Sequence, residues 1–99
     1  MIRHVVFFTA RNPNDRDMIF DGLNLLQGIP HKRFLEVGCN LATDPIPGTH
    51  PDFVVYGEFD DEAQLIAFKD HPLYQESIKK VRPLRDLRMS ADFLSGQGN

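Results

Sequence analysis

The feature that most constrains this sequence is a pair of short segments that carry apolar residues on both of their alternating faces. One runs from Ile2 to Thr9 and the other from Asp52 to Phe59. Both are rich in Val and Phe and are too short for a typical helix, so they predict β-strands. An antiparallel sheet with one wet face shows a clean alternation of apolar and polar residues. We therefore expect these strands to form a sheet that is covered on both faces.

Two further strands and one loop follow from the same kind of pattern. Residues 33–41 and residues 85–93 each place apolar side chains at alternate positions, which is typical of strands. Residues 42–51 contain three of the seven prolines together with a glycine, so they predict a loop. A lid over a ligand and an inert hairpin loop are both compatible with this composition.

Helices are expected in the intervals that remain. The first follows the turn residues 11–15, which include two asparagines placed to cap it, and it ends at residues 28–30. The second begins at the acidic residues 60–62, which suit the positive end of a helix dipole. His71 and Pro72 interrupt this helix, and Pro72 suits the first turn of a third one.

The predicted order is β-α-β-β-α-α-β, which indicates two βαβ-like halves and no short internal repeat. We expect an α+β fold: a ferredoxin-like, split βαβ antiparallel sheet with its helices on one face. A chain of 99 residues holds one hydrophobic core, so residues 1–94 are predicted to form a single domain. Residues 95–99 are predicted to be a frayed tail.

Composition and motif content exclude several classes of function. A net charge of −3 without a basic stripe argues against a nucleic-acid partner. The longest apolar run, Val5 to Phe8, is too short for a membrane span or a signal peptide, so we expect a cytoplasmic protein. Cys39 is the single cysteine, and no two histidines have the spacing of metal ligands, so no metal site is expected.

The sheet face without helices needs another partner. It is predicted to expose four apolar side chains in one patch, and a soluble monomer rarely keeps such a patch open. The tail from Ser95 to Asn99 has no apolar residue that would cover it. We therefore expect a homodimer that packs sheet against sheet. The residues predicted for this dimer face are Val5, Phe7, Val54 and Tyr56.

Several motifs in this order resemble the stress-responsive dimeric α/β-barrel (Dabb) family over residues 2 to 93. The matching segments are Ile2 to Phe8, Phe59 to Ala63, Ala67 to Pro72, Val81 to Leu84 and Ala91 to Phe93. The resemblance implies two ferredoxin-like subunits whose sheets close into an α+β barrel. Many members of the family have no assigned reaction, and some plant members are stress-induced proteins.

One plant member of the family is a polyketide cyclase that closes a ring by an aldol step without a cofactor. It uses a tyrosine and a histidine, and the matching positions here are Phe68 and Tyr74. Phenylalanine lacks the hydroxyl, and a phenol is a poor base near neutral pH. His4 matches a pocket-lining histidine, and Tyr74 is expected to project toward the same pocket. His4 and Tyr74 are therefore the candidate catalytic residues.

The pocket is expected between the sheet and the helices. Its other predicted lining residues are Val6, Phe8, Phe53, Val55, Phe68 and His71. His4 can equally be a hydrogen-bonded core residue, and His71 can simply cap the helix junction. Arg85 and Arg88 belong to a basic cluster that either compensates a helix dipole and stays solvated or binds a carboxylate.

Two functions are compatible with the sequence. The first is a stress-responsive protein that binds a small apolar ligand, with no cofactor and no turnover. The alternative is a cofactor-independent cyclase or isomerase that acts on a small apolar carbonyl compound through His4 and Tyr74. The two differ in whether the pocket is open with a polar inner end or is plugged by Phe8, Phe53 and Phe68.

Overall fold

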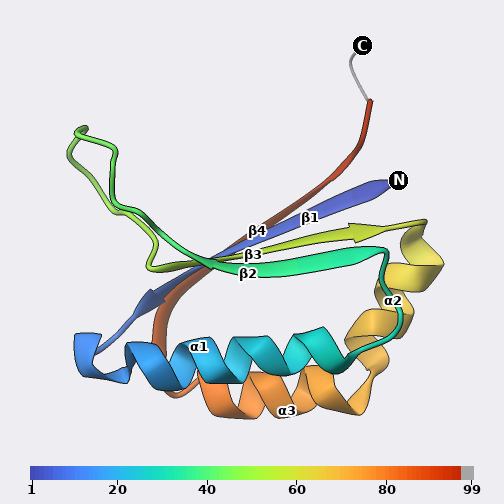
Figure 1. Cartoon of the computed structure of the whole chain (residues 1–99), viewed down its shortest axis with the longest axis horizontal. Helices are drawn as coiled ribbons and strands as arrows, with labels where there is room; N and C mark the ends of the chain where they lie inside the picture. Colours follow the sequence, from blue (N-terminus) through green and yellow to red (C-terminus); the bar gives the residue numbers. More distant parts are fainter. Residues whose placement is uncertain (97–99) are drawn as a thin grey trace.

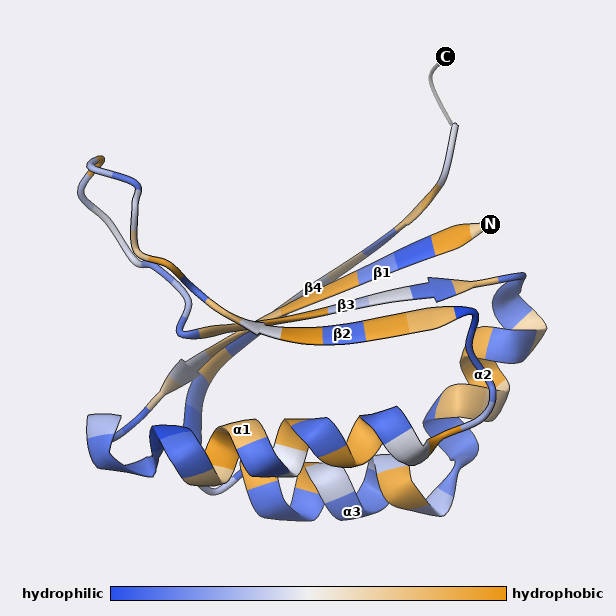
Figure 2. Cartoon of the chain, viewed as in Figure 1, coloured by the Kyte–Doolittle hydropathy of each residue, from blue (hydrophilic) through white to orange (hydrophobic). Residues whose placement is uncertain are grey.

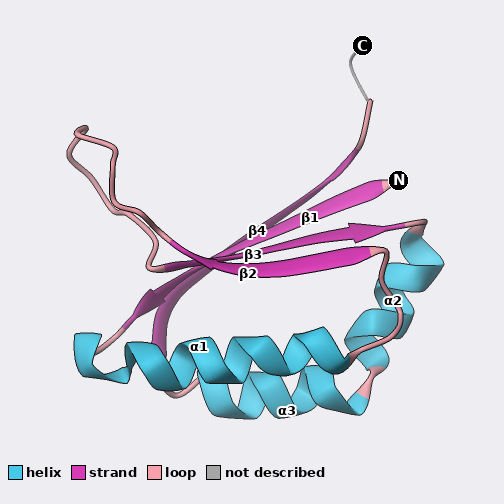
Figure 3. Cartoon of the chain, viewed as in Figure 1, coloured by secondary structure: helices cyan, strands magenta, loops and turns pink. Residues whose placement is uncertain are grey.

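The computed structural model of the chain describes residues 1–96 and contains a four-stranded antiparallel sheet with the order β2-β3-β1-β4. The strands are β1 (Ile2–Ala10), β2 (Phe34–Cys39), β3 (Phe53–Phe59) and β4 (Arg85–Leu94). The α-helices are α1 (Arg16–Asn24), α2 (Glu62–Asp70) and α3 (Pro72–Val81), and Pro13–Asp15 and Leu25–Gly28 form short 3-10 turns. Figures 1 and 3 show this arrangement, which confirms the predicted ferredoxin-like fold.

The helices lie together on one face of the sheet, with α1 and α3 side by side (Figure 1). The hydrophobic core fills the space between the two layers. Its most deeply buried side chains are Ile19, Leu23, Ile29, Val55, Phe59 and Phe68. Within residues 1–96, no helix has the length and the apolar character needed to cross a membrane.

Gly22 allows α1 and α3 to approach closely. A Cβ atom at this position would lie 2.8 Å from Cγ2 of Val81, which is closer than real side chains pack. The hydroxyl of Ser77 on α3 also donates a hydrogen bond to the Gly22 carbonyl at 2.8 Å. This buried hydrogen bond joins α1 to α3.

His71 forms the junction between α2 and α3. Its backbone is extended, and its Nδ1 accepts a hydrogen bond from the backbone N–H of Leu73 at 3.1 Å. Pro72 follows at the first helical position, where its missing N–H costs nothing. The predicted capping role of His71 is therefore confirmed.

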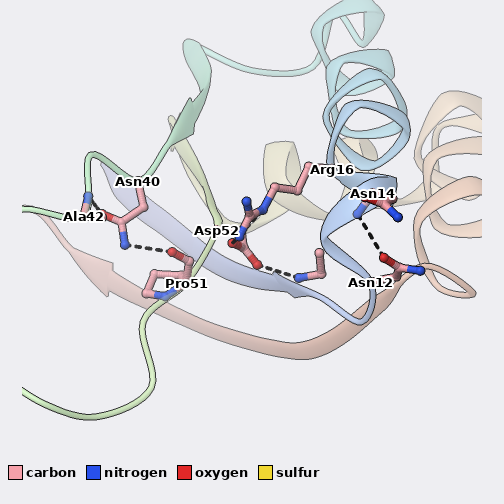
Figure 4. A network of polar contacts seen from close by, with 8 residues as sticks. Asn12, Asn14, Arg16, Asn40, Ala42, Pro51 and Asp52 are labelled. Atoms are coloured by element: carbon pink, nitrogen blue, oxygen red, sulfur yellow. Dashed lines mark hydrogen bonds and ion pairs between the residues drawn. The ribbon is translucent and has the colours of Figure 1, made fainter.

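The strand predicted at residues 33–41 is shorter in the structure because Asn40 redirects the chain. Its side-chain oxygen accepts a hydrogen bond from the N–H of Ala42 at 2.9 Å, and its amide donates to the carbonyl of Pro51 at 2.7 Å (Figure 4). These bonds close the base of the loop that connects β2 to β3. Figure 1 shows this loop extending beyond the end of the sheet.

Asp52 joins three segments at the same end of the sheet. One carboxylate oxygen accepts from the backbone N–H of Ala10 at 2.7 Å, and the other lies 2.9 Å from Nη2 of Arg16 (Figure 4). The start of α1 is thereby tied to the ends of β1 and β3. This joint sets the position of α1 over the sheet.

The face of the sheet opposite the helices, called the outer face below, collects apolar side chains from all four strands. Strand pairing places Val5 between Tyr56 and Ala91, and it places Phe7 between Val54 and Met89. The hydropathy colouring shows apolar segments along these strands (Figure 2). The larger apolar residues of this face are Val5, Phe7, Phe34, Val54, Tyr56, Met89 and Phe93.

The described part of the chain ends just after β4. The backbone N–H of Ser95 donates to the carbonyl of Met1 at 2.8 Å, and its hydroxyl accepts from Nη2 of Arg3 at 3.1 Å. Ser95, at the start of the predicted tail, is therefore hydrogen-bonded to the other end of the chain. Residues 97–99 of that tail lie outside the described residues.

Candidate functional site

A cavity of about 300 Å³ lies between the sheet and the helices. Strands β1, β3 and β4 line it on one side, and helices α1, α2 and α3 line it on the other. Its lining residues are His4, Val6, Phe8, Leu23, Leu26, Val55, Phe68, Tyr74, Ser77, Ile78, Val81, Arg82, Arg85 and Arg88. A mostly apolar wall with a few polar groups is typical of a small-molecule site.

His4 is the buried polar group of the cavity wall. It lies in the middle of the sheet on β1, is 3% exposed, and packs edge-on against the ring of Phe59. The pairing of β1 with β4 places Asp92 directly opposite, and Nδ1 of His4 is hydrogen-bonded to Oδ1 of Asp92. A carboxylate only accepts hydrogen bonds, so Nδ1 carries the hydrogen and Nε2 keeps its lone pair.

The electrostatic surroundings favour the neutral form of His4. Burial lowers the pKa of its imidazole, and the hydrogen bond to Asp92 and the charge of that residue oppose this effect. The charges of Lys69 and Arg88 lower the pKa further. Near neutral pH the wall therefore offers an oriented, uncharged imidazole whose Nε2 can accept a hydrogen bond from a bound molecule.

Tyr74 lies on α3 and lines the same cavity as His4. Its ring packs edge-on against Phe68, with 5.6 Å between the ring centres. Among residues 1–96 no hydrogen bond fixes its hydroxyl. The phenol is therefore free to donate to a ligand.

Three arginines bring positive charge to the cavity. Arg82 follows the last residue of α3, whereas Arg85 and Arg88 belong to β4. The turn between them is held by the N–H of Leu84, which donates to the carbonyl of Val81 at 2.9 Å. This turn brings the end of a helix and the start of a strand to one side of the cavity.

The remaining residues predicted for the pocket divide into two groups. Val6, Phe8, Val55 and Phe68 line the cavity, and neither Phe8 nor Phe68 closes it. Phe53 instead lines a separate depression beside Asp52, and His71 lies at the helix junction.

Several residues of the site were not predicted from the sequence. Leu23, Leu26 and the buried side of α3 line the cavity because their helical spacing turns them toward the sheet. That spacing could have predicted them from the sequence. No sequence pattern predicts the contact of Asp92 with His4, because only the pairing of β1 with β4 brings the two residues together.

Solved structures share this fold. A dimeric ferredoxin-like protein of unknown function from Thermobifida fusca YX is 24% identical, with a TM-score of 0.78 and coverage of 93% of this chain and 88% of that chain. One from Jannaschia sp. CCS1 is 19% identical, with a TM-score of 0.80 and coverage of 94% and 97%. A Dabb family protein from Mesorhizobium loti MAFF303099 is 21% identical, with a TM-score of 0.76 and coverage of 94% of both chains.

The TM-scores establish the common fold. A search among curated proteins finds no match. The family model described as the stress responsive A/B barrel domain, Dabb, matches residues 2–95. This match spans all four strands and all three helices, as the motifs in the sequence led us to expect. The chain therefore belongs to the Dabb family of stress responsive A/B barrel domains.

Proposed function

We propose that this protein is a cytoplasmic homodimer that binds a small, largely apolar molecule in the cavity between sheet and helices. The observation that carries the proposal is the cavity itself, which stays open at about 300 Å³ although aromatic rings line it. Ligand sites combine apolar walls with a few placed polar groups, and here His4 and Tyr74 are such groups.

The volume limits the size of the molecule. An apolar cavity of about 150 Å³ takes up benzene, so about twice that volume suits a compound with two fused rings. Packing against Val6, Ile78 and Val81 would remove the apolar surface of such a compound from water. The uncharged imidazole of His4 would accept a hydrogen bond from a hydroxyl or amino group of the compound, and the hydroxyl of Tyr74 would donate one to an oxygen atom.

The outer face supports the dimer. Its apolar side chains need cover, and two structural relatives are described as dimeric. Three of its polar side chains are paired with one another within the protomer: the hydroxyl of Tyr56 donates to Glu58 at 2.6 Å and accepts from Arg3 at 3.1 Å. Paired polar groups can be buried at a sheet-to-sheet interface without losing their partners.

Ligand binding is tested by filling the cavity. Ile78→Phe adds a ring to a half-buried lining residue, whereas Ile66→Phe makes the same change at an exposed position on α2 that does not line the cavity. The neutral probe is 1-aminonaphthalene, followed by its fluorescence. We expect binding to the natural protein and to Ile66→Phe, and a loss of at least about tenfold in Ile78→Phe. Equal binding by all three proteins, or by none, would contradict the proposal.

The pairing of His4 with Asp92 also favours a second function, a cofactor-independent cyclase or isomerase. An oriented imidazole can act as a general base, and Tyr74 can stabilise a developing oxyanion. Phe68 offers no acid or base. We expect no measurable cyclisation of linear polyketide thioesters by the natural protein. Turnover that disappears in His4→Ala would instead support the enzyme.

A further inference from the structure

The geometry points to an anion-binding subsite formed by Arg82, Arg85 and Arg88. The ligand of the cavity is then a small molecule with an apolar ring system and one carboxylate group. This inference rests on the proposed function, because it concerns a molecule bound in the same cavity. The three arginines line one continuous space together with the apolar wall. A ligand with its ring system on that wall can therefore reach the guanidinium groups with one substituent.

The positive charge at this position is not neutralised by the protein. Within residues 1–96 the ion pairs are His4–Asp92, Arg16–Asp52 and Arg33–Asp60, and none of them includes a cavity arginine. The cavity lining contains no aspartate or glutamate. Nη1 of Arg85 donates a hydrogen bond to the uncharged backbone carbonyl of Asp86 at 3.2 Å.

Compensation of a helix dipole explains one member of the group. Arg82 follows α3, where a cation is favourable next to the exposed carbonyls. Arg85 and Arg88 lie on β4, and a strand has no comparable dipole. Arg88 is paired with Phe8, so its side chain is on the helix-covered face. Its charge also contributes to the lowered pKa of His4, which places it within electrostatic reach of the cavity wall.

The surroundings favour a carboxylate over a phosphate. Phosphate sites commonly use a helix N-terminus, where backbone N–H groups and the positive end of the dipole meet the anion. Here the nearby helix end is the C-terminus of α3, which is the negative end. The planar fork of an arginine matches a carboxylate with two parallel hydrogen bonds. A singly charged, planar anion therefore fits this position best.

The experiment compares three probes that share one ring system: 2-naphthoate, neutral 2-naphthamide and 2-naphthyl phosphate. Their dissociation constants are measured by calorimetry on the full chain. We expect 2-naphthoate to bind about tenfold or more tightly than 2-naphthamide, as for hydrogen bonds between charged groups. Arg85→Gln and Arg88→Gln should each remove most of this preference.

Lys79→Gln is the matched control, because it removes one positive charge from an exposed position on α3 that does not line the cavity. It should keep the preference for 2-naphthoate. Equal affinity for 2-naphthoate and 2-naphthamide would overturn the anion subsite and leave ligand binding intact. Tighter binding of the phosphate would overturn the carboxylate assignment. Failure of all three probes to bind would reject the proposed function as well.

Discussion

At the residue scale, His4 combines burial with one hydrogen-bonded carboxylate. The imidazole is almost inaccessible to water. Asp92 lies on β4, an edge strand of the sheet, and its side chain is partly exposed. Burial is the larger influence, so the pKa of His4 lies below the ordinary value of 6.5. Because the pKa of His4 is lowered on folding, the free energy of unfolding depends on pH.

The free energy of unfolding should decrease as the pH falls below about 6.5. In that window the unfolded chain binds a proton at His4 while the folded chain, with its lowered pKa, does not. His4→Asn removes the titrating group and keeps a donor for Asp92, so urea unfolding between about pH 7.5 and pH 5 should show a flatter dependence. His50→Asn makes the same change at an exposed histidine and is the matched control variant. An NMR titration that places His4 at or above 6.5 would contradict this account.

At the element scale, the contact between α1 and α3 determines how the helical layer closes over the cavity. Leu23 and Leu26 follow Gly22 and line the cavity from one side, while Ile78 and Val81 line it from α3. The spacing of the two helices therefore affects both stability and the shape of the site.

Gly22→Ala should destabilise the protein by about 1–2 kcal/mol. Alanine is the better helix former, but its methyl group would lie 2.8 Å from a buried, β-branched Val81 and 3.3 Å from Lys80. The overpacking outweighs the gain in helix propensity. Thermal unfolding compares this variant with Asp21→Ala on the exposed side of α1, which should change stability by less than about 0.5 kcal/mol. A Gly22→Ala variant as stable as the natural protein would show that the helices can move apart freely.

At the scale of the whole molecule, the outer face is the surface through which we expect two copies of the chain to pair. Phe7, Phe34, Met89 and Phe93 are between 38% and 65% exposed in the protomer, and they lie on one side of one sheet. The paired sheets of two copies would cover these side chains. An interface of standard size buries roughly 1,200–2,000 Å² in total.

Light scattering at micromolar concentration should therefore report twice the 11.3 kDa mass of the chain. Val5→Asp places a charge in the middle of the outer face and should dissociate the dimer. Met89→Asp should do the same from a position that is 65% exposed in the protomer, where a charge does not prevent folding. Ile66→Asp, at a similarly exposed position on α2, should remain dimeric. A natural protein that scatters as an 11.3 kDa particle would refute the dimer.

Much of the fold could be predicted because it depends on local periodicity. The alternation in β1 and β3, the acidic start of α2 and the break at His71 and Pro72 each act within a few residues. Boundaries were less accurate where a side chain redirects the backbone, as Asn40 does at the end of β2. No period in the sequence signals such a bond.

By itself, the sequence determined the order of strands and helices, the side of β1 that holds His4, and the excess of apolar surface on the opposite side. Only the tertiary structure decided that Asp92 lies beside His4, 88 positions away along the chain, and that Arg82 joins the arginines of β4 at an open cavity. The physical reason is that periodicity assigns a residue to a face, whereas strand register and the packing of rings decide which faces meet. The space left between Phe8, Phe68 and Tyr74 is a property of that packing, and no single segment encodes it.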